Sequence, residues 1–130
     1  MTATKPAQIY KCDLCGNIVE VLHGGSEALV CCGENMKLQT TKTEDKGAEK
    51  HVPECSVVDG KLQVQVGSTP HPMEDEHFIE WVEVLTEDAV QRVHLKPGQD
   101  PKAIFPDVPT KATVREFCNV HGHWETSFTS

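Results

Sequence analysis

Apolar and polar residues alternate along several short segments in the second half of the chain, and turn-forming residues separate these segments. Asp59-Gly60 stands between Val57-Val58 and the alternating run 62–66, which is a strong signal for a two-residue β-hairpin. Because the pattern has the period of strands and no helical period, an antiparallel sandwich or barrel of the immunoglobulin-like type is expected. Further strands are predicted over residues 78–85, 90–95, 112–117 and 124–128.

The first forty residues form a separate small region that is rich in cysteine. A strand is predicted over residues 17–22, a turn at Gly24-Gly25, and a second strand over residues 28–30 that leads back to Cys31. About forty residues bury too little apolar surface to fold unaided. A metal ion is therefore expected to hold this region together.

A polar stretch separates the two regions. Residues 40–47 contain no large apolar side chain, which is typical of a linker. The predicted organisation is a small metal-binding domain over residues 1–39, the linker 40–47, and a β domain over residues 48–130.

Composition and charge limit the classes of function. The chain has 130 residues and a formal net charge of -8, which disfavours nucleic-acid binding because phosphate contacts need clustered Lys and Arg. No secretory signal and no membrane-spanning stretch is recognisable, so a cytoplasmic location is expected. Thiols stay reduced in that compartment, so the six cysteines are interpreted as metal ligands or free thiols rather than disulfides.

Four cysteines have the spacing of one metal site. Cys12 and Cys15 form a CxxC motif followed by Gly16, and Cys31 and Cys32 supply two further sulfurs. Tetrahedral sulfur ligation selects zinc or iron. Two adjacent cysteines cannot form the second CxxC turn of an ordinary zinc ribbon, which favours iron.

Four of the seven histidines lie at strand ends or in loops, where separate loops of one sandwich can converge. Singly, each is more typical of a surface histidine than of a ligand. Cys118 and His121 form a CxxH pair, which is a stronger signal for a metal half-site. Imidazoles together with a thiolate suit iron, copper or zinc. The histidines are His51, His71, His77 and His121.

These motifs together resemble the desulfoferrodoxin family, the two-iron superoxide reductases. The resemblance covers nearly the whole chain in order, and its joint pattern is highly specific. It is carried by Cys12-x2-Cys15 with Cys31-Cys32, Glu49-Lys50-His51-Val52-Pro53, His71-Pro72-Met73, His77, and the run Cys118-Asn119-Val120-His121-Gly122-His123-Trp124.

The resemblance implies a desulforedoxin-like Fe(Cys)4 centre in the first domain and a second iron on the immunoglobulin-like domain. It implies four imidazole ligands in a plane from the four histidines, Cys118 as the axial thiolate, and an open sixth position in the ferrous state. The implied reaction is one-electron reduction of superoxide to hydrogen peroxide. Lys50 is the implied cation at the mouth of the site, and Glu49 the residue that can occupy the sixth position of the ferric iron.

The resemblance further implies a rubredoxin-like electron donor and a homodimer. Cys55 has no counterpart in the family pattern, and a small buried hydrophobe is the preferred interpretation of it. Two other interpretations of the sequence remain: a structural zinc module joined to a partner-binding β-sandwich, and an electron carrier that uses both irons. Metal content, colour and a superoxide assay discriminate among the three.

Overall fold

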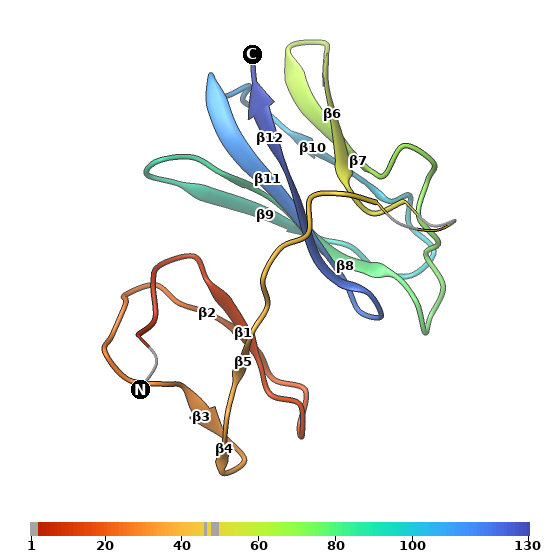
Figure 1. Cartoon of the computed structure of the whole chain (residues 1–130). Helices are drawn as coiled ribbons and strands as arrows, with labels where there is room; N and C mark the ends of the chain where they lie inside the picture. Colours follow the sequence, from red (N-terminus) through yellow and green to blue (C-terminus); the bar gives the residue numbers. More distant parts are fainter. Residues whose placement is uncertain (1–2, 46, 48–49) are drawn as a thin grey trace. The chain divides into compact units, whose positions relative to one another are not determined.

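The computed structural model describes residues 3–45, 47 and 50–130. The chain divides into two compact units, Met1–Thr40 and Thr41–Ser130, and all regular structure in the described residues is β-strand (Figure 1). Nowhere in these described ranges is there a helix with the length and apolar character that crossing a membrane requires.

The smaller unit holds two short antiparallel sheets. One sheet has the strand order β2-β1-β5 and the other pairs β3 with β4. The strands are β1 (Ile9–Lys11), β2 (Ile18–Glu20), β3 (Val30–Cys31), β4 (Glu34–Asn35) and β5 (Lys37–Leu38).

The predicted hairpin across Gly24-Gly25 is wrong. Strand β2 pairs with β1, across the loop that carries the CxxC motif, and β3 pairs with β4. The Gly24-Gly25 segment lies instead against Thr4, whose N–H donates to the carbonyl of Gly25 at 2.9 Å and whose hydroxyl accepts from the Gly25 N–H at 2.8 Å. A Cβ at Gly24 would come within 2.5 Å of the Thr4 carbonyl oxygen, so glycine is needed here for a close backbone approach rather than for a turn.

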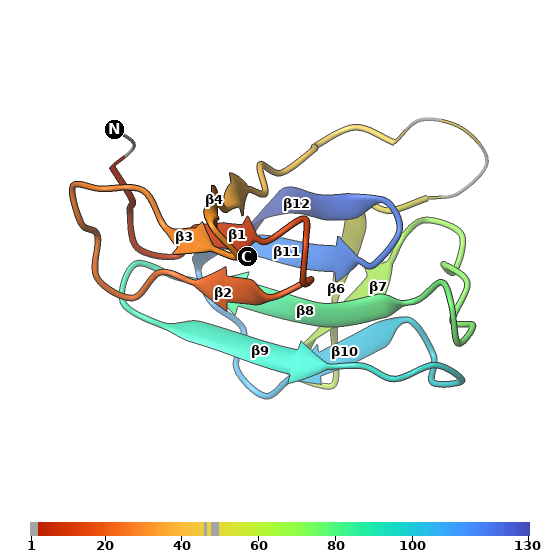
Figure 2. The ribbon, with the colours of Figure 1, turned by 90° about the horizontal axis from the view of Figure 1, so that it is seen from below.

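The larger unit is a sandwich of two antiparallel sheets, as the alternation predicts. One sheet has the order β10-β7-β6 and the other β12-β11-β8-β9, and Figure 2 shows the four strands of the second sheet in that order. The strands are β6 (Pro53–Val58), β7 (Lys61–Val66), β8 (Ile79–Leu85), β9 (Val90–His94), β10 (Lys102–Phe105), β11 (Lys111–Cys118) and β12 (Gly122–Thr129).

The core of the sandwich lies between the two sheets and includes one cysteine of the CxxH pair. Alternate residues of β7, β8 and β11 point inward, so each strand contributes a row of apolar side chains. Cys55 of β6 packs at the edge of this cluster. Its buried members are Leu62, Val64, Val66, Ile79, Val82, Val84, Leu95, Ala103, Phe105, Ala112, Val114 and Cys118.

The Asp59-Gly60 hairpin is confirmed. It joins β6 to β7, and both turn residues have positive φ angles, 53° and 73°. Two successive positive φ angles define the type I′ turn, whose twist matches that of the flanking strands.

The opposite face of the four-stranded sheet carries a buried ionic cluster. Glu83 has no exposed surface and accepts hydrogen bonds from Arg92 (2.6 and 3.0 Å) and Arg115 (2.8 Å). Burial raises the pKa of Glu83, but the interactions with His123, Arg115 and Arg92 outweigh burial and bring the pKa down to about 2. The cluster therefore joins strands β9, β8, β11 and β12 through one ionised carboxylate.

Candidate metal centres

The structure brings together the four cysteines of the smaller unit. Their sulfur atoms all lie within 4.8 Å of one another, with Cys15 Sγ 3.5 Å and Cys32 Sγ 4.0 Å from Cys31 Sγ. All four are free thiols. Sulfurs about 2.3 Å from a tetrahedral ion lie about 3.8 Å apart, so the four fit a single metal ion.

Two tight turns create this arrangement. Gly16 has a φ of 85° and donates its N–H to the carbonyl of Cys12 at 3.0 Å, while the N–H of Cys15 points at Cys12 Sγ at 3.5 Å. Cys32 and Gly33 form the two-residue turn between β3 and β4, with φ angles of 54° and 76°. Both values are those of a type I′ turn, which explains how two adjacent cysteines can face one ion.

The ionisation of these thiols also fits a cation. Backbone N–H groups of Cys15 and Leu14 lower the pKa of Cys12 to about 7. The neighbouring sulfurs of Cys15, Cys12 and Cys31 raise the pKa of Cys32 to about 12. Four thiolates this close repel one another, so a bound metal ion is what allows all four to lose their protons.

The larger unit gathers the second predicted set of donors. One donor atom from each of five side chains lies within 4.8 Å of all the others. The Nε2 atoms of His51 and His71 are 3.0 Å apart, and Cys118 Sγ lies 3.5 Å from His71 Nε2 and 3.9 Å from His121 Nδ1. Donors about 2.1 Å from one ion lie about 3 Å apart when adjacent and about 4 Å when opposite, so this set also fits a metal ion.

The four imidazoles form a closed ring of neighbours. Successive ring centroids from His51 to His71, His77, His121 and back to His51 lie 4.6, 4.8, 5.1 and 5.0 Å apart. Each imidazole meets the next edge-on, at interplanar angles of 60–87°. Cys118 Sγ contacts two diagonal members of this ring, His71 and His121. One imidazole nitrogen from each histidine and the Cys118 sulfur therefore lie close enough to serve as five donors to one metal ion.

Loop and strand ends position these side chains. Cys118 ends β11 and Gly122 begins β12, so the CxxH motif is the turn between them. The N–H of His121 points at Cys118 Sγ at 3.4 Å. Asn119, in the same turn, accepts from the Phe78 N–H at 2.9 Å and donates to the Glu76 carbonyl at 3.0 Å. These two bonds tie the CxxH turn to the loop on both sides of His77.

The buried imidazoles are held by further contacts. His71 Nδ1 lies 2.7 Å from the Pro72 carbonyl, which requires the proton on Nδ1 and leaves Nε2 as a metal donor. The His51 ring stacks on the indole of Trp124, with centroids 4.6 Å apart and an interplanar angle of 11°.

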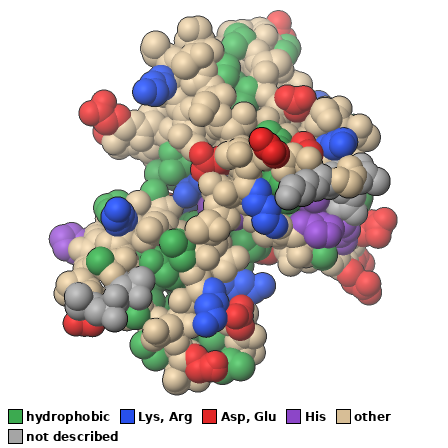
Figure 3. Space-filling view, in the orientation of Figure 1, with side chains coloured by type: hydrophobic (Ala, Val, Ile, Leu, Met, Phe, Trp, Pro, Cys, Tyr) green, Lys and Arg blue, Asp and Glu red, His purple; other side chains and the backbone are tan. Residues whose placement is uncertain are grey.

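One side of the cluster reaches the surface. His51, His71 and Cys118 are buried, His77 is half-buried and His121 is exposed. Figure 3 shows a group of histidine side chains at the surface on the right of the view. A small anion can therefore approach from the side of His77 and His121.

Comparison with known proteins agrees with this geometry. A family model described as desulfoferrodoxin matches residues 43–127, and one described as its N-terminal domain matches residues 4–39. The chain belongs to the desulfoferrodoxin family. Desulfoferrodoxin from Desulfarculus baarsii is 51% identical over 118 residues, which cover 91% of this chain and 94% of the relative. The superoxide reductase of Thermococcus kodakarensis is 33% identical over 115 residues, 72% of this chain and 98% of the relative.

A solved structure is also similar. The crystal structure of the superoxide reductase from Treponema pallidum superposes with a TM-score of 0.75 at 26% identity, covering 92% of this chain and 96% of that one. The two clusters match the two-iron arrangement of desulfoferrodoxin, so the cofactors are one Fe(Cys)4 and one Fe(His)4(Cys).

The motif also contains two predicted catalytic residues, Glu49 and Lys50. Glu49 lies outside the described residues. Lys50 is half-buried, and its ammonium donates to the Gly47 carbonyl at 3.2 Å. A Cβ on Gly67 would come within 2.7 Å of the Lys50 carbonyl carbon and oxygen, so a glycine at 67 lets the backbone of Lys50 lie close to the end of β7.

Glu116 is a buried carboxyl on β11, two residues before Cys118. It points inward with Val114 and Cys118 and has no exposed surface. Burial, with a smaller effect of Asp45, raises the pKa of Glu116 well above its usual value. The period of two along β11 is the signal that could have placed it inside.

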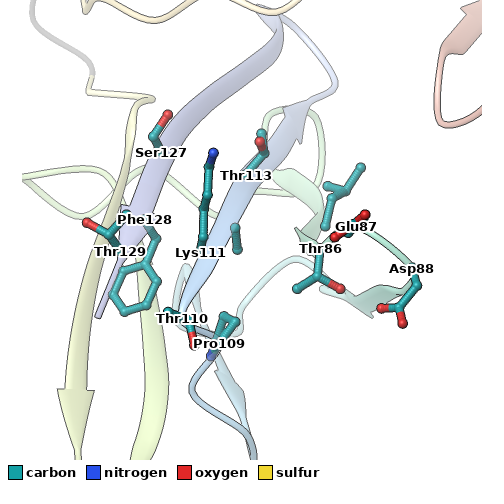
Figure 4. A pocket seen from close by; sticks show the side chains of 12 residues that line it. Thr86, Glu87, Asp88, Pro109, Thr110, Lys111, Thr113, Ser127, Phe128 and Thr129 are labelled. Carbon is teal, nitrogen blue, oxygen red and sulfur yellow. The ribbon is translucent and has the colours of Figure 1, made fainter.

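A separate hollow of about 600 Å³ opens at the other end of β8, β11 and β12. Figure 4 shows Lys111 between Thr113 and Ser127, with Phe128 nearby. The residues that line this hollow include neither histidine nor cysteine. The hollow is therefore not part of either metal centre.

Proposed function

We propose that this chain reduces superoxide at its His4Cys centre: superoxide, one electron and two protons give hydrogen peroxide. The chain is an oxidoreductase, a superoxide reductase. The relative from Thermococcus kodakarensis and the structural neighbour from Treponema pallidum bear that name. The observation that carries the proposal is the closed ring of four imidazoles with the Cys118 sulfur in contact with two of them, His71 and His121.

The proposed ligands are those four imidazoles and the Cys118 thiolate for the second iron, and the four cysteines of the smaller unit for the first. Ferrous iron held by these five protein donors would supply the one electron and would retain room for superoxide. An electron carrier works best with closed coordination, and a zinc module has no redox chemistry. The five-donor set therefore favours a reductase over both.

Each side chain of this centre has a chemical task. The Cys118 thiolate would donate electron density to a bound iron and so tune its potential. The contact of His71 Nδ1 with the Pro72 carbonyl fixes the tautomer and the orientation of that ring. The exposed side formed by His77 and His121 gives solvent access, so water can supply the two protons.

Lys50 and Glu49 are proposed to serve the approach and release of small ligands. Superoxide is an anion and the chain carries a net charge of -8, so a cation next to His51 in sequence raises the encounter rate locally. Glu49 is proposed to occupy the sixth position after the product leaves, which rests on the family motif.

The division of labour between the domains is also proposed. Residues 1–39 hold the Fe(Cys)4 centre, residues 40–47 link it to the rest, and residues 48–130 carry the reductase. The first centre relays electrons or stabilises its small domain. A rubredoxin-like donor, a homodimer and a cytoplasmic location are proposed from the family resemblance and from the reduced thiols that both centres need.

The test compares His51→Ala with His94→Ala. His51 belongs to the ring of imidazoles, whereas His94 lies at the end of β9 outside both clusters. We expect His51→Ala to lose the second iron and superoxide reduction while the Fe(Cys)4 centre stays, and His94→Ala to keep both irons and full activity. Undiminished superoxide reduction in His51→Ala would refute the assignment of the reaction to this cluster.

A further inference from the structure

Thr41 and Lys42 are fixed to the hairpin that contains the CxxH turn. Lys42 pairs with β12 as a single parallel bridge opposite Trp124. Its N–H donates to the His123 carbonyl at 3.0 Å, and its carbonyl accepts from the Glu125 N–H at 2.9 Å. The Thr41 hydroxyl donates to the Glu125 carboxylate. A stretch that its composition marks as a linker therefore adds a short edge to the four-stranded sheet.

The side chain of Lys42 contacts two parts of the cluster's frame. Its ammonium donates to the carbonyl of His121 at 3.0 Å and lies 4.8 Å from the centroid of the Trp124 ring, within the range of a cation–π interaction. The same indole stacks on His51. One ammonium thus acts on the backbone of one imidazole donor and on the ring that supports another.

Asp45 contacts the backbone of His51, another of the imidazole donors. Its carboxylate accepts the backbone N–H of His51 and, at 3.1 Å, that of Val52. These bonds fix the backbone at the point where the His51 side chain leaves it. Within five residues, Thr41–Asp45, the chain therefore constrains the positions of both His51 and His121.

We propose that Thr41–Asp45 is a positioning strap for the His4Cys centre, with Lys42 and Asp45 as its positioning residues. They act through His121, Trp124 and His51, and neither contributes one of the clustered donor atoms. Residues that hold metal ligands in place typically change metal affinity by 10–100-fold when they are removed. The inference rests on the proposed function only in taking this cluster as an iron site.

The experiment measures how fast the ferrous, two-iron protein releases iron to an excess of chelator. The absorption of the Fe(Cys)4 centre serves as an internal reference, and circular dichroism checks the fold. We expect Lys42→Ala to release the second iron roughly tenfold faster than wild type. Lys42→Arg should stay within about twofold of wild type, because arginine also donates to a carbonyl and stacks on indole. Lys102→Ala, at an exposed lysine of β10, is the matched control.

Asp45 gives a second, independent arm. Asp45→Asn keeps an oxygen acceptor for the two backbone N–H groups, whereas Asp45→Ala removes it, so only Asp45→Ala should release iron faster. Release from Lys42→Ala at the rate of Lys102→Ala would overturn the inference, and so would equal release from Asp45→Ala and Asp45→Asn. A wild-type protein that retains iron but fails to reduce superoxide would refute the proposed function. It would not contradict the positioning role of Thr41–Asp45.

Discussion

The ionic cluster on the four-stranded sheet allows a quantitative prediction about stability. The perturbation is Glu83→Gln, which replaces a buried carboxylate by a neutral amide of similar shape. The pKa of Glu83 falls from 4.5 to about 2 in the folded protein. At about 1.4 kcal/mol for each tenfold change in proton affinity, folding therefore gains about 3 kcal/mol from the ionised group.

The sign of the pH dependence follows from the direction of the shift. Because the folded-state pKa lies below the unfolded-state value, the contribution is fully present above a pH of about 4.5 and disappears as the pH falls towards about 2. We expect Glu83→Gln to lower the free energy of unfolding by about 3 kcal/mol at pH 7, and by less than half of that at pH 3.

Urea denaturation followed by tryptophan fluorescence measures this, because both tryptophans lie in the larger unit. Glu87→Gln is the matched control, since Glu87 is an exposed carboxylate in the turn between β8 and β9. The reasoning is refuted if Glu83→Gln and Glu87→Gln have the same stability at pH 7. It is also refuted if the difference from wild type stays constant down to pH 3.

Three further substitutions test the proposed assignments. Cys15→Ser should lose the first iron and loosen the smaller unit, yet keep superoxide reduction with an artificial reductant; activity at background with the second iron still bound would contradict this. Cys55→Ser should leave both metal spectra unchanged, because burial, with a smaller effect of Glu54, raises the pKa of the Cys55 thiol to about 11 and keeps it protonated; loss of either iron would show the ligand set to be incomplete. Lys50→Ala should slow the reaction with superoxide and weaken its salt dependence in pulse radiolysis, since the field of one cation extends about 8 Å at physiological ionic strength; an unchanged rate and salt slope would remove Lys50 from the mechanism.

The strands of the larger unit could be predicted because each has a local signal. Alternation marks β7 and β12, and Asp59-Gly60 marks the turn after β6. Strand β10 gave no such signal, because its four residues lie between Pro101 and Pro106. It becomes a strand through pairing with the distant β7, which local sequence does not encode.

Pairing in the smaller unit could not be predicted from turn chemistry alone. Gly24-Gly25 has the composition of a hairpin turn, but the backbone of Thr4 occupies the space beside it. The turns that do reverse the chain are those that present sulfur atoms, at Gly16 and at Cys32-Gly33. Metal ligation and pairing are therefore coupled in this unit.

The donor residues of the second centre carry sequence signals, whereas Lys42, which contacts the backbone of His121, does not. The CxxH spacing and the joint family pattern single out the five donors. Lys42 has no such pattern, because its contact with His121 joins positions 79 residues apart in the chain. Only the folded structure shows that this polar side chain helps to frame the cluster.

The yield of hydrogen peroxide per superoxide consumed tests the central claim most directly. The measurement adds a known amount of superoxide to the fully reduced two-iron protein without oxygen and determines peroxide and oxygen together. A reductase gives one hydrogen peroxide for each superoxide and no oxygen, with one electron taken from the protein. A yield of one peroxide for every two superoxides, with oxygen released, would mean dismutation and would contradict the account.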